Sequence, residues 1–218
     1  VESSEVINAQ ALSGAYDYQV RHIQFKNFTT LKENEERGGY RVGLYPTDST
    51  AAGALYFNLT TRDDQKRELF ANQDFKVALS HAIDRNEINE LVYNGVGVPR
   101  NIEGYVPRSP FYDEELAFAY SEFDVETANR LLDEVGLAER DNDGFRLGPD
   151  GNAFQLNVVA TTTADTDVLE LVKSYWENVG VKTEIDQVDR TLYEERQYSN
   201  EFEVAVWGQA KMLRPDFE

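Results

Sequence analysis

Residues 72–95 carry two apolar stripes of helical spacing, with a helix start signal between them. The first stripe consists of Phe75, Leu79, Ala82 and Ile83. Asp84 follows, and its carboxylate can accept a hydrogen bond from the amide of Glu87, whose own side chain can reach back as in a capping box. The second stripe, which comprises Ile88, Leu91 and Val92, stops before Gly95, a residue type that ends helices. We therefore predict two short helices that meet at a bend around residues 82–86 and pack on a sheet.

The rest of the chain alternates predicted strands and helices. Runs rich in β-branched and aromatic residues predict strands at 18–23, 40–45, 54–58, 154–160, 181–188 and 202–207. Helices are predicted at 3–13, 30–37 and 124–136, from Asp165 or Asp167 to Gly180, and at 192–198, with a hairpin around 145–147. The strand, helix and strand between residues 154 and 188 form a βαβ unit, for which a right-handed crossover is expected. This alternation predicts an α/β fold.

Composition narrows the class of protein. A chain of 218 residues with 41% hydrophobic residues predicts a folded globular protein. The net charge of −19 leaves no basic field for nucleic acid, and it fits either an acidic soluble surface or adaptation to salt. Cysteine is absent, which excludes disulfides and thiolate sites. No apolar run is long enough to span a bilayer, and residues 1–6 lack signal-peptide features, so a secreted protein would be seen here after processing or as an excised piece.

The sequence offers little for an enzyme. His22 and His81 stand apart from any nucleophile or metal motif, and we find no nucleophile elbow or phosphate-binding glycine loop. We expect no cofactor. A calcium loop is one interpretation of the oxygen-bearing residues and glycine at Glu139, Asp141, Asp143, Gly144 and Asp150. Ordinary turns are the favoured interpretation, because positions 1 and 12 carry the wrong acidic residues and Pro149 stands where a helix should begin.

One region resembles a known family. Phe57-Asn58, then Ala78-Leu-Ser-His-Ala-Ile-Asp-Arg85 and Gly95, are similar to the signature of the peptide- and nickel-type extracellular solute-binding proteins of family 5. Phe75-Lys76 departs from it, since the family has Val-Arg there. Further similarities occur at residues 13–18, in the proline-rich loop 96–110 and in the helix at 123–136. The resemblance covers nearly the whole chain as a middle piece of longer proteins.

The resemblance implies an architecture of two lobes. It predicts a periplasmic-binding-protein-like type II lobe with a mixed sheet and flanking helices. Residues 1–56 would be a remnant of the first lobe, residues 57–206 the second, inserted lobe, and residues 207–218 the truncated return crossing. The implied function is the substrate-binding component of an ABC importer. Such a component captures an oligopeptide or similar polar solute by hinge closure and delivers it to permease subunits.

The resemblance also implies a setting and leaves alternatives. The full-length protein is expected to be extracellular or periplasmic, anchored as a lipoprotein, and monomeric. A sensor or partner-binding relative that uses the same lobe is one alternative, and a hydrolase domain is another.

Binding clefts favour domain interfaces with aromatic walls and a few placed polar groups. By the same resemblance, Phe57-Asn58 is similar to the outgoing crossing between the lobes and residues 202–208 are similar to the return crossing. Residues of these types near the two crossings are Tyr56, Asn58, Arg190, Tyr193, Trp207 and Gln209, and we predict that they bind the solute. Core packing is the alternative for Trp207, which ends an apolar strand. Peptide-binding members of the family hold the ligand's amino terminus with an acid shortly after the return strand, but here no carboxylate precedes Asp216. Lys211 and Arg214 instead favour a carboxylate or a neutral polar solute.

Overall fold

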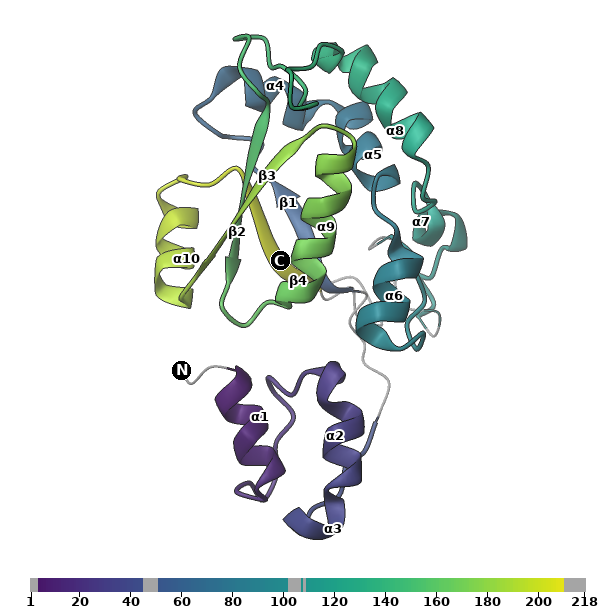
Figure 1. Cartoon of the computed structure of the whole chain (residues 1–218), viewed down its shortest axis with the longest axis vertical. Helices are drawn as coiled ribbons and strands as arrows, with labels where there is room; N and C mark the ends of the chain where they lie inside the picture. Colours follow the sequence, from purple (N-terminus) through teal and green to yellow (C-terminus); the bar gives the residue numbers. More distant parts are fainter. Residues whose placement is uncertain (1–3, 45–50, 102–106, 108, 210–218) are drawn as a thin grey trace.

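The computed structural model describes residues 4–44, 51–101, 107 and 109–209, and its centre is a four-stranded mixed sheet (Figure 1). The strands are β1 (Ala51–Phe57), β2 (Gln155–Thr161), β3 (Lys182–Val188) and β4 (Val204–Gln209), in the spatial order β1-β4-β2-β3. Strand β4 pairs antiparallel with β1 and parallel with β2, and β2 pairs parallel with β3. The predicted mixed α/β fold is confirmed.

The predicted βαβ unit is formed by β2, helix α9 (Thr166–Asn178) and β3. Asp165 begins the helix, because its side chain accepts a hydrogen bond from the amide of Asp167 at 3.1 Å. Gly180 ends this segment with a φ of +86°, a left-handed conformation in which a side chain would be strained. Strands β2 and β3 then pair over seven residues, from Gln155↔Lys182 to Thr161↔Val188.

The two helices predicted within residues 72–95 are α5 (Gln73–His81) and α6 (Arg85–Tyr93). The Asp84 carboxylate accepts from the Glu87 amide at 2.9 Å, as expected for a cap. The Glu87 carboxylate takes a different partner from the one predicted, since it accepts from the Tyr175 hydroxyl at 2.6 Å. The helix ends one residue earlier than predicted, because Asn94 already adopts a left-handed φ of 50°.

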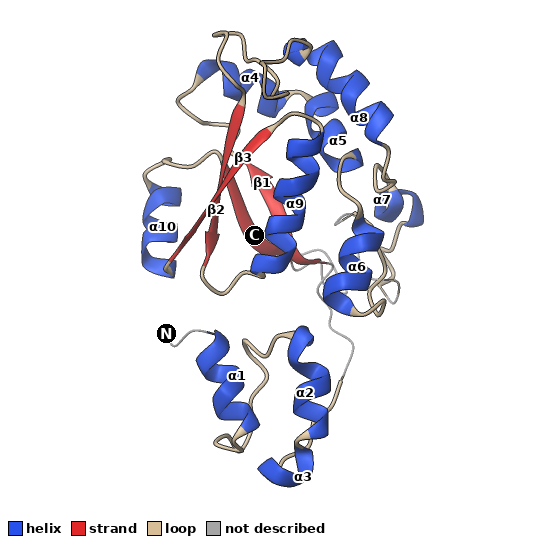
Figure 2. Ribbon diagram, in the orientation of Figure 1, coloured by secondary structure: helices blue, strands red, loops and turns tan. Residues whose placement is uncertain are grey.

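Helices cover both faces of the sheet (Figure 2). On one face, α5 and α9 bury Phe75, whose ring meets those of Phe57 and Phe154 at 5.9 and 5.8 Å between centroids. Trp176 ties the two helices together, since its indole N–H donates to the Leu79 carbonyl at 3.1 Å. The other face packs against α10 (Arg190–Tyr198). Further helices around the core are α4 (Asp64–Ala71), α7 (Glu114–Phe118) and α8 (Val125–Leu132), and α8 continues into a wider turn at Asp133–Leu137.

A buried arginine holds the predicted hairpin against this core. Isolated antiparallel bridges, Arg140↔Arg146 and Leu147↔Ala153, confirm the hairpin. The Arg146 side chain is only 1% exposed, and its guanidinium donates to the carbonyls of Leu137 and Val179. Sequence reasoning missed this role, because an arginine in a charged turn region is normally solvated.

The N-terminal segment differs most from the prediction. It contains α1 (Ser4–Leu12), a 3-10 turn η1 (Phe25–Asn27), α2 (Phe28–Glu33) and α3 (Glu35–Gly38), so the helix predicted at 30–37 is broken at Asn34. The strands predicted at 18–23 and 40–45 are wrong, since residues 18–23 and 40–44 form no strand. Tyr45, the end of the second prediction, lies outside the described residues. Strands need a neighbour for their N–H and C=O groups, and the described sheet offers these segments none.

This segment meets the rest of the chain at a small contact. Turn η1 lies against α6, and Lys26 pairs with Asp167 of α9 at 2.8 Å. Strand β1 already belongs to the sheet at Ala51, so residues 51–56 pair with β4 and not with the N-terminal helices. The division into two lobes at residue 56 stays a prediction.

Candidate functional site

The carboxyl edge of the sheet is where the structure gathers most of the predicted binding residues. Strands β2, β3 and β4 run in the same direction, so Thr161, Val188 and Gln209 all lie at one edge. Strand β1 starts at that edge, because Ala51 pairs with Gln209. Helices α9 and α10 also begin there (Figure 2). In open α/β sheets, ligands bind outside the carboxyl ends of the strands.

An aromatic–arginine cluster occupies the α10 side of this edge. The rings of Tyr193 and Trp207 stack with centroids 5.4 Å apart and planes 22° apart. The Arg190 guanidinium carbon lies 5.1 Å from the centroid of the Trp207 ring, a cation–π distance, while its Nε donates to Glu194 at 2.7 Å. Trp207 remains 40% exposed, so an aromatic edge and a cation face solvent together.

Tyr193 anchors the cluster and Tyr56 extends it. The Tyr193 side chain is buried, and its hydroxyl donates to the Val206 carbonyl at 3.0 Å. Burial raises the pKa of Tyr193 to about 12, with a smaller contribution from Tyr56. Tyr56 pairs with Ala205 and therefore lies on the same sheet face as Trp207, diagonally across the strand pair. Four predicted residues, Tyr56, Arg190, Tyr193 and Trp207, are thus brought together.

The other two predicted residues lie elsewhere or outside the described side chains. Asn58 is buried beyond the end of β1 that lies away from the carboxyl edge. It is about 13 Å along the strand from Ala54, the residue that pairs with Trp207. Its amide donates to the Phe202 carbonyl at 2.8 Å and to Asn200 Oδ1 at 2.7 Å. This side chain therefore joins the ends of β1 and β4. Gln209 pairs with Ala51 through its backbone, and the expectations for Lys211, Arg214 and Asp216 lie outside the described residues.

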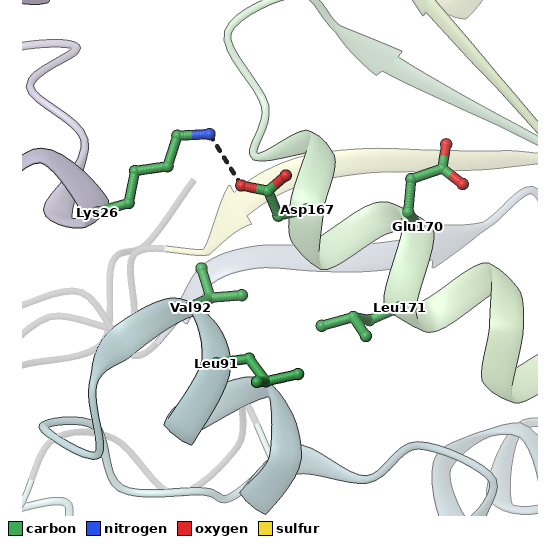
Figure 3. Close-up of a pocket in the computed structure, with 6 residues that line it drawn as sticks. All are labelled: Lys26, Leu91, Val92, Asp167, Glu170 and Leu171. Carbon is green, nitrogen blue, oxygen red and sulfur yellow. Dashed lines mark hydrogen bonds and ion pairs between the residues drawn. The ribbon is translucent and has the colours of Figure 1, made fainter.

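A cavity on the other side of the edge was not predicted. It measures about 390 Å³ and lies between η1, α6 and α9 (Figure 3). Its lining comprises Lys26, Leu91, Val92, Asp167, Glu170 and Leu171. Sequence spacing could not reveal it, because Lys26 and Asp167 are 141 residues apart. Near this cavity, burial raises the pKa of Tyr93 to about 12, with Asp165 adding to the effect.

His81 and the acidic loop at residues 139–150 make hydrogen bonds within the fold. The His81 ring shares a hydrogen bond with the Glu122 carbonyl at 2.9 Å, and His22 adopts a left-handed φ of 63°. Asp141 Oδ1 accepts from the amides of Asp143 and Phe145 at 3.0 and 2.8 Å, as in an ordinary turn. In the described ranges, no three histidine or acidic side chains gather to hold a metal ion. None of the helices that the structure describes has the length and apolar character needed to cross a membrane.

A mixed sheet with helices on both faces and an aromatic–arginine cluster at its carboxyl edge is the arrangement expected of a periplasmic-type binding-protein lobe. The chain belongs to the bacterial extracellular solute-binding proteins, family 5, because the family's middle-region model matches residues 1–216. The predicted resemblance is therefore confirmed.

Similar curated proteins come from several bacteria. The periplasmic alpha-galactoside-binding protein of Rhizobium meliloti (strain 1021) is 27% identical over 171 residues, which are 76% of this chain and 24% of that protein. The oligopeptide-binding protein AppA of Bacillus subtilis (strain 168) is 26% identical over 160 residues, 70% of this chain and 28% of AppA. The chain thus spans less than a third of the length of these relatives, which are solute-binding proteins and not enzymes.

Solved structures share the fold. An oligopeptide-binding protein OppA superposes with a TM-score of 0.76 at 38% identity, covering 99% of this chain and 35% of OppA. The periplasmic binding protein MelB from Agrobacterium fabrum C58, in complex with stachyose, gives a TM-score of 0.77 at 22% identity, covering 96% of this chain and 33% of MelB. AppA from Bacillus subtilis in complex with a nonapeptide gives a TM-score of 0.79 at 19% identity, covering 99% of this chain and 41% of AppA.

Proposed function

We propose that this chain is the second-lobe part of the substrate-binding component of an ABC importer. The component captures a polar solute, an oligopeptide or an oligosaccharide, outside the cell or in the periplasm and delivers it to permease subunits. The family match over residues 1–216 carries this proposal. The relatives named for α-galactosides and oligopeptides support both solute classes. We further propose that the full-length protein works as a monomer anchored as a lipoprotein.

Capture would use the aromatic–arginine cluster. The exposed part of Trp207 offers apolar contact, and Tyr56 lies on the same sheet face. Arg190 adds a guanidinium whose Nε is held by Glu194, so the terminal nitrogens are oriented for a carboxylate or for hydroxyl groups. These groups suit a carboxylate-bearing or neutral polar solute. No covalent step is needed.

Closure would bring the first lobe over this cluster. Strands β1 and β4 run side by side to the carboxyl edge, where Ala51 pairs with Gln209. Two adjacent crossing segments permit a hinge, because rotation at a few residues next to the strand ends moves one lobe as a rigid body. A closed cleft buries most of a small ligand between lobes, so this chain alone should bind several kcal/mol more weakly than the full-length protein.

Calorimetry on the full-length protein tests the proposal. Free and N-acetylated oligopeptides and neutral oligosaccharides are titrated into the wild type and into Trp207→Ala. We expect at least a tenfold loss of affinity, about 1.4 kcal/mol, in the variant. Tyr198→Ala is the matched control, because Tyr198 is an 88% exposed aromatic residue of the same lobe outside the cluster. Equal affinity of this chain and the full-length protein would contradict closure of two lobes.

If the protein is instead a sensor or partner-binding relative, it should bind the same solute but take no part in solute uptake. Uptake of the labelled solute by cells with and without the gene separates the two. Unchanged uptake in the deletion strain, with the permease genes intact, would favour the sensor.

A further inference from the structure

The cation of the aromatic–arginine cluster is already paired with a carboxylate. Arg190 Nε donates to Glu194 Oε1 at 2.7 Å, about one turn further along α10. The guanidinium carbon also lies 5.1 Å from the centroid of the Trp207 ring. Two contacts therefore hold the guanidinium, although both charged side chains remain partly exposed, 57% for Arg190 and 41% for Glu194. The pair brings no net charge to the cluster.

The charges around this pair are mostly acidic. Residues 186–198, which include α10 and the end of β3, carry four acidic side chains against two arginines, a net charge of −2. The other arginine, Arg196, is paired with Asp186, and the Asp189 carboxylate caps α10. A solute carboxylate would have to displace Glu194 from its partner in a field that already repels an anion. The cluster is therefore better suited to a neutral solute.

The pair presents hydrogen-bond donors and an acceptor side by side. In the part of the chain that the structure describes, neither the terminal nitrogens of Arg190 nor Glu194 Oε2 makes a hydrogen bond. A hydroxyl group both donates and accepts. One hydroxyl of a sugar ring can accept from the guanidinium while the next hydroxyl donates to the carboxylate. Neighbouring hydroxyls on one ring thus match the pair.

Aromatic surface lies next to these polar groups. Arg190 and Tyr193 are three residues apart on α10, so both approach the Trp207 ring from the helix side. Trp207 nevertheless remains 40% exposed, and Tyr56, on the same sheet face, is 37% exposed. A sugar ring has an apolar face of C–H groups and a polar rim of hydroxyls. The cluster offers a matching surface to each, because aromatic rings and a donor–acceptor pair stand together.

We propose that Glu194 selects a neutral saccharide for this cluster. Its carboxylate neutralises Arg190, so carboxylate-bearing solutes are disfavoured, and its second oxygen accepts from a hydroxyl of the sugar. Arg190 donates to the adjacent hydroxyl, and the apolar face of the sugar lies on the exposed part of Trp207. The inference rests on the proposed function, and it narrows the solute from an oligopeptide or an oligosaccharide to the saccharide.

Calorimetry on the full-length protein tests the selection by charge. The neutral trisaccharides raffinose, maltotriose and cellotriose are compared with their C6 uronates, and with trialanine as free acid and as amide. We expect a neutral trisaccharide to bind about tenfold more tightly than its uronate. Glu194→Gln frees Arg190 and should narrow this ratio to about threefold or less. Glu195→Gln removes the same charge from an exposed neighbour on α10 and should leave the ratio unchanged.

A second variant separates hydrogen bonding from charge. Arg190→Lys keeps the positive charge but loses the planar fork of donors. We expect it to weaken binding of the neutral trisaccharide by about threefold to tenfold, the effect of one or two lost hydrogen bonds. Arg196→Lys is the matched control, because Arg196 belongs to the same helix and pairs with Asp186 outside the cluster. It should bind the trisaccharide as the wild type does.

The outcomes separate this inference from the importer function. Tighter binding of the uronate, or a ratio unchanged by Glu194→Gln, would overturn the role of Glu194. Capture of trialanine and of none of the sugars would overturn the saccharide and leave the importer function in place, and binding of no probe would also overturn the saccharide. Capture of a neutral saccharide whose uptake does not require the gene would overturn the importer function alone.

Discussion

Replacing Arg146 with methionine should destabilise the fold. The guanidinium is buried, and its Nε donates to the Val179 carbonyl at 2.7 Å and its Nη2 to Asn129 Oδ1 at 2.8 Å. A further bond goes to the Leu137 carbonyl, and Asp133, which is 54% exposed, supplies the counter-charge. Methionine keeps most of the stem and removes every donor.

The expected loss follows from the groups left behind. The Val179 carbonyl retains a hydrogen bond from Arg140 at 3.0 Å, and the Asp133 carboxylate can be hydrated, so neither adds much to the loss of stability. Asn129 Oδ1 likewise keeps a bond from Arg140 at 2.8 Å, and the Asn129 carbonyl keeps one from the Asp133 amide. The Leu137 carbonyl loses its partner, so we expect a loss of about 1–3 kcal/mol in the free energy of unfolding. With a urea m-value of about 2–3 kcal/mol per molar, the unfolding midpoint should fall by roughly 0.5–1 M.

Arg140→Met provides the matched control. Arg140 bonds to the Val179 carbonyl as Arg146 does, and also to the Gly144 carbonyl at 2.7 Å, but its side chain is exposed. Water can replace those bonds, so the loss should stay below about 1 kcal/mol. If Arg146→Met unfolds within 1 kcal/mol of the wild type with an unchanged m-value, the reasoning from buried unsatisfied carbonyls is refuted.

Three further predictions concern caps and charge. Asp84→Ala removes the acceptor for the Glu87 amide and should cost about 1 kcal/mol in urea unfolding, whereas a neutral result would deny the cap any role. Hydrogen bonds from Thr127 lower the pKa of Asp124 below 3.8, so its carboxylate stabilises the fold above that pH and the contribution disappears as pH falls through the lower value. Urea midpoints between pH 6 and 3 should therefore fall less steeply for Asp124→Asn. The net charge of −19 predicts that the melting temperature rises between 0.05 and 1 M NaCl, and a flat response would exclude self-repulsion as a destabilising force.

The fold between residues 51 and 209 could be predicted because its signals are local. Asp84, Asp124 and Asp165 each cap the helix that their position in the sequence indicated. The segments at 18–23 and 40–45 have strand-like composition, yet they form no strand in the described residues. Strand formation depends on a partner, which composition does not specify.

The site was predictable only in part. Aromatic and cationic residue types next to the crossings led to Tyr56, Arg190, Tyr193 and Trp207, and their role in binding stays a prediction. Asn58 has the right chemistry, but its bond to Asn200, 142 residues away, occupies its amide. The pairing of Lys26 with Asp167 likewise depends on the tertiary fold. Contacts across such separations leave no pattern in a single sequence.

The central position of β4 has a consequence for the synthesis of the chain. Phe57 pairs with Val204, so roughly 150 residues must be made before β1 can find its partner, a separation that favours slow folding. Until β4 is synthesised, β1 and β2 each keep an unpaired edge. The core on the α5 and α9 face then lacks Val204, and the core on the α10 face lacks Ala205. A nascent chain that stops before residue 204 therefore exposes apolar strands that can pair with other chains. The growing polypeptide should depend on chaperones until β4 appears, and then complete this sheet in a single late step.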